Sequence, residues 1–168
     1  MKTTITQNGD LKIITQYAKT YSDPPERERV GCRAIIIENG KVLLSYEENI
    51  GVYMSPGGGV ESGESFEECV ARELREEAGY IVKPVKHLLR VDEYCFETLW
   101  VNNYFICEIQ GECEKSLTKT EIEHGIKPVW VELNKAIEIF GEYESKREDH
   151  ASLYLREYTV LKGLLTCY

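Results

Sequence analysis

The sequence lacks the features that mark several large classes of protein. No apolar run approaches the ~20 residues that a membrane-spanning helix requires, and the N-terminal residues MKTTITQNGD have no apolar signal core. There is no CxxC pair among the six scattered cysteines, which favours reduced thiols over a disulfide framework; they are Cys32, Cys69, Cys95, Cys107, Cys113 and Cys167. We therefore expect a cytoplasmic protein with no membrane partner.

The sequence also has fewer basic than acidic residues. The 29 acidic residues outnumber the 20 basic ones and give a formal net charge of -9. Such a balance argues against a surface that grips polymeric nucleic acid through many phosphate contacts. A small polyanionic substrate would then need metal ions or a local basic pocket.

Length and organisation favour one domain over residues 1–168. A chain of 168 residues with 42% hydrophobic content can bury one good core, and it has no internal repeat or low-complexity tract. The only linker-like stretch runs from Tyr21 to Arg29 and carries Asp23-Pro24-Pro25. We interpret residues 1–29 as an N-terminal extension with a strand at about Leu11 to Tyr17, and as a candidate element for a homodimer.

Several segments have the pattern of β-strands. Val30 to Glu38 is apolar and β-branched, Asn39-Gly40 suits a tight two-residue turn, and Lys41 to Tyr46 continues as a partner strand. This pattern predicts a hairpin. Further strands, the long ones bent or interrupted, are predicted at four places: Gly51 to Met54, Tyr80 to Tyr94, Leu99 to Ile109 and Lys127 to Val131.

Two helices are predicted among these strands. Ser65 with Glu68 three residues later is a capping box, and Gly79 suits a left-handed C-terminal cap, so one helix should span Phe66 to Ala78. Apolar residues recur at helical spacing from Asp149 to about Leu165. Strands and helices in this order predict an α/β fold whose mixed sheet is covered on both faces.

The first helix follows a glycine-rich segment and gathers negative charge. Gly57-Gly58-Gly59 precedes it, and on a helical wheel Glu73, Glu76 and Glu77 share one sector while apolar residues share another. Carboxylates at this spacing repel one another, and a cation would relieve the repulsion. Oxygen ligands suit Mg²⁺ or Mn²⁺, and the lack of neighbouring histidine or cysteine argues against zinc.

A glutamate-rich helix alone is usually just a solvated face, but here the spacing is distinctive. Gly58, then Glu64, then the run Arg72 to Gly79 with sequence RELREEAG resembles the Nudix box, which would span Gly58 to Tyr80. One departure is Tyr80, where the family normally has an aliphatic residue. The resemblance implies a Nudix-type α/β/α sandwich, a mixed β-sheet flanked by helices.

The resemblance also implies roles for individual residues. Glu73, Glu76 and Glu77 would be ligands of Mg²⁺ (or Mn²⁺), and Gly58 would give a backbone carbonyl or a close approach to the metal site. Arg72 would orient a glutamate through a salt bridge, and Glu64 would support the loop or reach an ion through water. The general base differs among family members; here it is either Glu73 or a residue of the loop Thr118 to Lys127, where we favour Glu123 slightly over Glu121 as base and further metal ligand.

Substrate contacts are less sharply defined. Arg33 stands where Nudix chains often place a substrate-facing basic group, and Arg90 or Lys41 could assist with phosphates. Aromatic residues could stack a base, although in strands they usually pack in a core; the candidates are Tyr53, Tyr94, Phe96 and Trp100.

The resemblance predicts an enzyme that cleaves a diphosphate linkage in a small, nucleotide-like substrate. No proline lies at the distance beyond the box that is typical of ADP-ribose hydrolases, since Pro84 is too close and Pro128 too far. We favour a nucleoside triphosphate, split into monophosphate and pyrophosphate. The alternatives are an NDP-sugar or dinucleoside polyphosphate hydrolase and, from another class, a regulatory module that binds a nucleotide without cleaving it.

Overall fold

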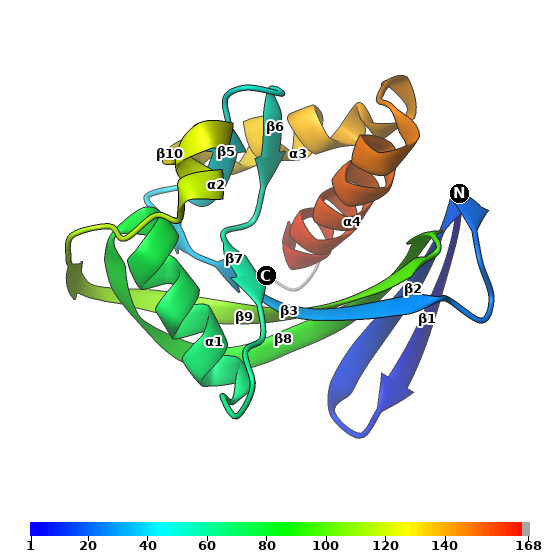
Figure 1. The fold of residues 1–168 in the computed structure, drawn as a ribbon, viewed down its shortest axis with the longest axis horizontal. Helices are drawn as coiled ribbons and strands as arrows, with labels where there is room; N and C mark the ends of the chain where they lie inside the picture. Colours follow the sequence, from blue (N-terminus) through cyan, green and yellow to red (C-terminus); the bar gives the residue numbers. More distant parts are fainter. Residues whose placement is uncertain (166–168) are drawn as a thin grey trace.

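The structure, a computed structural model, describes residues 1–165. Its larger sheet has six strands in the order β1-β2-β8-β9-β3-β7 (Figure 1). Within this sheet β2 is parallel to β8 and β3 is parallel to β9, while the other neighbours are antiparallel. The strands span Lys2–Asn8, Leu11–Tyr21, Tyr80–Phe96, Thr98–Glu112, Arg27–Ile35 and Gly57–Gly59 in that order. The predicted mixed sheet is confirmed.

A smaller sheet lies beside it, in the order β10-β5-β4, with β6 also paired to β5. These strands span Ile126–Glu132, Lys41–Glu47, Ile37–Glu38 and Val52–Met54. The turn at Asn39-Gly40 has positive φ at both residues, 50° and 75°, as a type I′ hairpin requires. The turn prediction is confirmed.

The strand before that turn was predicted wrongly as one continuous unit over Val30 to Glu38. β3 ends at Ile35 and belongs to the larger sheet, whereas only Ile37 and Glu38 pair with β5. Both Ile35 and Ile36 are buried, in different hydrophobic clusters. The apolar run is therefore the crossing between two sheets, and periodicity alone does not distinguish it from one strand.

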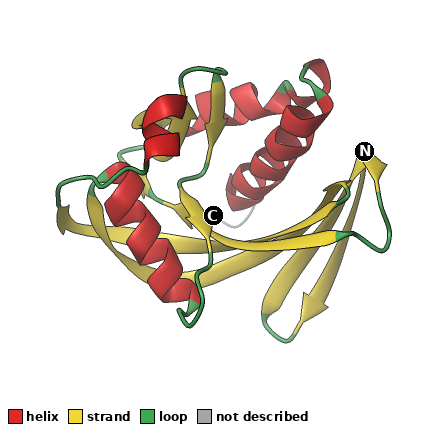
Figure 2. Ribbon diagram, in the orientation of Figure 1, coloured by secondary structure: helices red, strands yellow, loops and turns green. Residues whose placement is uncertain are grey.

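The helices cover both faces of the sheets (Figure 2). α1 (Phe66–Glu73) continues without a break into the π-helix η1 (Leu74–Ala78). The others are α2 (Lys119–His124), α3 (Leu133–Gly141), the short 3₁₀-helix η2 (Tyr143–Ser145) and α4 (Glu148–Leu165). The capping box is present, with Ser65 and Glu68 each bonded to the other's backbone N–H, and Gly79 ends η1 with φ 74°.

Two hydrophobic clusters lie on opposite faces of β9, because successive strand residues point to opposite sides. Phe105 packs with Val70 and Leu74 of the α1–η1 helix, whereas Tyr104 packs with Tyr154 and Leu161 of α4. Burial of these side chains, about 1.5–3 kcal/mol each before entropy is counted, fixes both helices to the sheet. The helix α1 and the segment Gly57–Gly59 are thereby held together at one edge.

Other elements extend or correct the predictions. The N-terminal strand exists as β2, and β1, which was not predicted, pairs with it as a fully exposed edge strand; the homodimer stays a prediction. β8 and β9 are interrupted by register shifts, as expected for the long strands. The segment Thr118 to Lys127 is not a plain loop, because α2 occupies its middle.

Two further predictions concern sulfur and membranes. Cys32, Cys69, Cys95, Cys107 and Cys113 are free thiols, and Cys167 lies outside the described residues. Within residues 1–165 no helix is both long enough and apolar enough to cross a membrane.

Candidate active site

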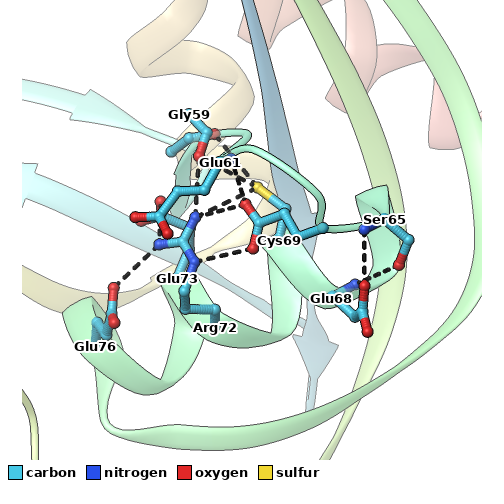
Figure 3. Close-up of polar contacts among 10 residues, drawn as sticks. Gly59, Glu61, Ser65, Glu68, Cys69, Arg72, Glu73 and Glu76 are labelled. Carbon is cyan, nitrogen blue, oxygen red and sulfur yellow. Dashed lines mark hydrogen bonds and ion pairs between the residues drawn. The ribbon is translucent and has the colours of Figure 1, made fainter.

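Arg72 is the centre of a polar network on α1 (Figure 3). Its Nε and Nη2 donate to the two carboxylate oxygens of Glu64 at 3.0 and 2.8 Å, and Nη2 also donates to the carbonyl of Gly59 at 3.0 Å. Nη1 donates to Glu73 at 2.9 Å and to Glu76 at 3.1 Å. A guanidinium has five N–H donors, so each has an oxygen acceptor here. The predicted salt bridge is present, and it holds three glutamates rather than one.

The strength of this network is visible in the pKa of Glu64. The hydrogen bonds from Arg72, reinforced by the backbone N–H of Glu61, lower that pKa from 4.5 to about 2. Glu64 is therefore ionised at neutral pH and supports the loop before α1 by bonding both Glu61 and Arg72. This is the loop-supporting alternative of its two predicted roles.

Glu73 lies against Gly58, the middle residue of the glycine segment Gly57–Gly59. Its side chain is buried, and burial raises its pKa although Arg72 and Arg33 act in the opposite direction. A Cβ atom placed on Gly58 would lie only 2.4 Å from the Glu73 carboxylate. Any residue larger than glycine would displace that carboxylate, so Gly58 allows Glu73 to lie against the backbone; its approach to a metal ion stays a prediction.

Glu77 and Glu76 are neighbours in the sequence but contact different groups. From Leu74 to Ala78 the helix is a π-helix, which adds a residue to the turn and is frequent at functional sites. The buried Glu77 accepts from the Ser45 hydroxyl at 3.3 Å and from the Gly57 N–H at 3.4 Å. Glu76 instead reaches Arg72, with 39% of its side chain exposed.

The three carboxylates therefore lie around the glycine segment without converging on one point. In the part of the chain described, leaving aside the Glu121 side chain, no three acidic, histidine or cysteine side chains are close enough together to hold an ion. The chemistry of the donors nevertheless fits a hard divalent cation, because carboxylates and glycine carbonyls are oxygen ligands. The geometry at Gly58 is also consistent with such a cation. The Glu73 carboxylate occupies the space that a Cβ on Gly58 would fill, so carboxylate oxygens lie against the glycine backbone.

Arg33 reaches the same glycine segment from the other sheet face. Its Nη1 donates to the carbonyls of Gly57 at 2.8 Å and Ser55 at 3.3 Å, while its buried Nε has no partner among the described residues. An unpaired buried N–H of a cation is costly. Arg33 thus lies beside the glycines, and its predicted contact with substrate stays a prediction.

Two cavities meet at Arg33 and Trp100. One, of about 350 Å³, lies between the larger sheet, the β5–β6 turn and α4, and we call it the aromatic pocket; its lining includes Arg33, Glu47, Phe96, Trp100, Asp149 and Leu153. The other, of about 520 Å³, is lined by Arg33 and Trp100 together with Gly58 and Gly59, and we call it the glycine groove. Trp100 and Phe96 are 43% and 41% exposed, so both aromatic rings are open to a ligand.

The structure does not bring every predicted site residue to this place. Arg90 is paired with Asp92, at 2.5 and 3.0 Å, and stands opposite Asn103, whereas Arg33 stands opposite Tyr104. Since Asn103 and Tyr104 are successive strand residues, Arg90 and Arg33 point to opposite faces of the sheet. A phosphate contact by Arg90 stays a prediction without support from this geometry.

The two candidate bases beyond the box lie on α2. The backbone carbonyl of Glu123 accepts from the Asn49 side chain, and His124 pairs with Glu47 at 2.9 Å, so α2 is fastened to the β5–β6 turn. The side chain of Glu121 is outside the described part of the structure. The choice between Glu121 and Glu123 therefore stays open.

A second arginine network was not predicted. On α4, Arg156 donates to Glu93 at 2.6 Å and to Glu157 at 3.1 Å, and Glu157 also accepts from Tyr104 at 2.9 Å and from Ser55 at 2.6 Å. All five side chains are buried. The helical spacing of apolar residues predicts the helix itself, and no local pattern distinguishes Arg156-Glu157 from an exposed pair.

The fold and this site define a class of proteins in which a glycine segment faces a glutamate-rich helix, and comparison with known proteins identifies the class. The model of the NUDIX domain matches residues 25–155. The chain therefore belongs to the Nudix family.

Relatives of this chain have several names. It is 38% identical over 90 residues to YtkD of Bacillus subtilis (strain 168), which carries the provisional name 8-oxo-dGTP diphosphatase, with 54% of each chain covered. It is 46% identical over 99 residues to the ADP-ribose pyrophosphatase of Methanocaldococcus jannaschii, covering 50% of this chain and 58% of that protein. The chain thus spans little more than half the length of these relatives.

A solved structure has the same fold. The NUDIX hydrolase from Nitrosomonas europaea superposes with a TM-score of 0.60 at 22% identity, and the match covers 79% of this chain and 89% of the other. The predicted Nudix-type fold is confirmed by this likeness.

Proposed function

We propose that the protein is a metal-dependent pyrophosphohydrolase that splits a nucleoside triphosphate into a monophosphate and pyrophosphate. The observation that carries this proposal is the placement of Glu73 and Glu77 against the glycine segment, with Glu76 joined to it through Arg72, beside a groove that shares Arg33 and Trp100 with the aromatic pocket. The relative named as an 8-oxo-dGTP diphosphatase supports a triphosphate substrate.

In this proposal Gly58, Glu73, Glu76 and Glu77, with Glu123 as a further ligand, would hold Mg²⁺ or Mn²⁺. When bound, such an ion supplies positive charge that offsets the charge of the phosphates and favours attack by water. Arg72 keeps the carboxylates of Glu73 and Glu76 in place. Its five donors are fully used, so it acts on the ligands and leaves the substrate to other groups.

The remaining steps belong to other side chains. Arg33 binds a phosphate oxygen in the glycine groove, since it lines that groove and its guanidinium lies beside Gly57. The exposed ring of Trp100 lies between the two cavities and stacks the base, which extends into the aromatic pocket. A glutamate then accepts the proton of the attacking water. Glu73 suits this task because burial raises its pKa above the ordinary value of a glutamate, and Glu123 is the alternative.

A nucleoside diphosphate linked to a sugar is the second candidate substrate. The relative of Methanocaldococcus jannaschii that supports it is named as an ADP-ribose pyrophosphatase and has the higher identity of the two. A sugar in place of the third phosphate would require the same diphosphate contacts. The two candidates therefore differ only in what lies beyond the cleaved linkage.

The test is a substrate panel with Mg²⁺ and with Mn²⁺, scored for phosphate and pyrophosphate release. It contains canonical and oxidised nucleoside triphosphates, ADP-ribose, nucleotide sugars, dinucleoside polyphosphates and simple phosphomonoesters. We expect cleavage within a diphosphate bridge and none of the monoesters. Hydrolysis of monoesters, or inactivity throughout together with tight metal-independent binding, would overturn the proposal and favour a regulatory module.

A further inference from the structure

Glu157 is a buried carboxylate that the proposed reaction does not use. It lies in the middle of α4 with none of its surface exposed. Arg156, the neighbouring buried cation, already has a carboxylate partner in Glu93, at 2.6 Å. Glu157 is therefore a second negative charge beside one positive charge, in a region without solvent, and such an excess is expensive for folding.

The hydrogen bonds of Glu157 show which groups this buried charge holds in place. One oxygen accepts from Tyr104 and Arg156, and the other accepts from the hydroxyl of Ser55 at 2.6 Å. A hydrogen bond to an ionised acceptor at this distance is among the stronger ones that proteins make. Ser55 is itself fully buried, so no water competes for its hydroxyl.

Ser55 lies two residues before the glycine segment Gly57–Gly59. The carbonyls of Ser55 and Gly57 both accept from Arg33, and the carbonyl of Pro56 accepts from the N–H of Ala34 at 2.8 Å. Two residues beyond Ser55, the N–H of Gly57 reaches Glu77. The stretch 55–57 is thus fixed at one end by the carboxylate of α4 and at the other by a carboxylate of the helix that bears the Nudix box.

We propose that Glu157 is a positioning residue, which acts through Ser55 to set the glycine segment against Glu73 and Glu77. The inference rests on the proposed function, because it assumes that these carboxylates and Gly58 form the metal site. It adds that the geometry of this site depends on a helix that follows the Nudix box by some 70 residues.

The experiment compares two serine variants of the same full chain. Ser55→Ala removes the hydroxyl that Glu157 holds. The matched control is Ser152→Ala, because Ser152 is also a fully buried serine whose hydroxyl joins α4 to another element, accepting from Gln16 of β2 at 3.0 Å. A third variant, Glu157→Gln, keeps the shape of the side chain and removes its charge.

Mn²⁺ binding without substrate is measured first, from the electron paramagnetic resonance signal of free Mn²⁺. We expect Ser55→Ala and Glu157→Gln to weaken binding by about tenfold, and Ser152→Ala to leave it unchanged. Turnover at saturating substrate should fall in the first two variants by a similar factor with little change in KM. Thermal unfolding midpoints should fall in all three, since each loses a buried polar contact.

The outcomes separate this inference from the proposed function. If Ser55→Ala lowers only the unfolding midpoint and binds Mn²⁺ as tightly as Ser152→Ala, Glu157 has a purely structural role and the inference is wrong. If the unmodified protein itself binds no Mn²⁺ and hydrolyses no diphosphate, the proposed function fails first. Weaker Mn²⁺ binding confined to Ser55→Ala and Glu157→Gln supports the positioning role.

Discussion

The molecule contains two networks centred on arginine, and they differ mainly in their access to water. Arg72 on α1 bonds three glutamates and keeps 23% of its side chain exposed. Arg156 on α4 bonds two glutamates and a tyrosine and keeps 5%. The same functional groups thus form one network in contact with water and another in the core.

Because of this difference in exposure, the ion pairs of Arg72 can rearrange and those of Arg156 cannot. Glu76, the most exposed acceptor of Arg72, can exchange its partner at little cost, because ion pairs in contact with water are worth about 0–1 kcal/mol. The partners of Arg156 have no such alternative, since a buried charge without its partner is strongly unfavourable. We infer that the Arg72 network presents ligands, and that the Arg156 network fixes the framework on which they stand.

The largest expected effect comes from the ligands themselves. Glu77→Gln or Glu76→Gln should lower turnover by several orders of magnitude, because the site loses charge that binds the ion and stabilises the transition state. The fold should survive, since neither change removes core atoms. Turnover at saturating Mg²⁺ and the circular dichroism spectrum measure the two effects.

The matched control for these variants is Glu67→Gln, in the first turn of the same helix. Glu67 is exposed and takes no part in the network of Arg72, so its variant should keep full turnover. If Glu76→Gln and Glu77→Gln both retain the activity of Glu67→Gln, this face of the helix is not the catalytic site.

The next effect is on stability and should distinguish the two arginines. Arg156→Met leaves two buried carboxylates without their cation and should lower the free energy of unfolding by about 3–5 kcal/mol. Arg72→Met, at a site in contact with water, should lower it by about 1 kcal/mol or less while abolishing most of the turnover. Urea titrations of both variants give the comparison, and equal losses would contradict it.

A smaller effect is expected at α2. Glu123→Gln should reduce turnover by about tenfold to a hundredfold if this residue is the general base. Glu121→Gln, on the same short helix, is the companion variant, and pH profiles at fixed metal concentration compare them. If neither variant slows the reaction by about tenfold, Glu73 becomes the base.

The smallest expected effect is a loss of folding stability at low pH. The pKa of Glu64 is lowered to about 2 by Arg72, from 4.5. A lowered pKa means stabilisation that is complete above about pH 4.5 and is lost as the pH falls toward 2. The difference in unfolding free energy between the unmodified protein and Glu64→Gln, measured with chelator present, should therefore shrink over that interval. A difference that is constant from pH 6 to pH 2 would show that the ion pair contributes nothing.

Local patterns carried much of the fold and of the site. The capping box at Ser65 and Glu68, the turn at Asn39-Gly40 and the left-handed Gly79 are set by short-range chemistry, and the structure has all three. The acidic residues of the box are likewise local. Their arrangement was harder to foresee, because a helical wheel assumes 100° per residue, and η1 departs from it between Leu74 and Ala78.

Features that depend on contacts between residues far apart in the sequence could not be predicted. Ile35 ends β3 of the larger sheet and Ile37 begins β4 of the smaller one, and only the pairing of β3 with β9 determines where the first strand ends. The contact between Glu157 and Ser55 spans 102 residues. Nothing near either residue in the sequence indicates it, since a buried charge has the same local pattern as an exposed one.

The most direct test of the account locates the metal. Crystals grown with Mn²⁺ and a non-hydrolysable nucleotide would be measured near the manganese absorption edge, where anomalous scattering reveals the ion. The account predicts a peak in contact with carboxylates of Glu73, Glu76 or Glu77 and beside Gly57–Gly59, with the phosphates in the glycine groove. A nucleotide bound in that groove with no manganese at these glutamates, in a protein that is active with Mn²⁺, would contradict it.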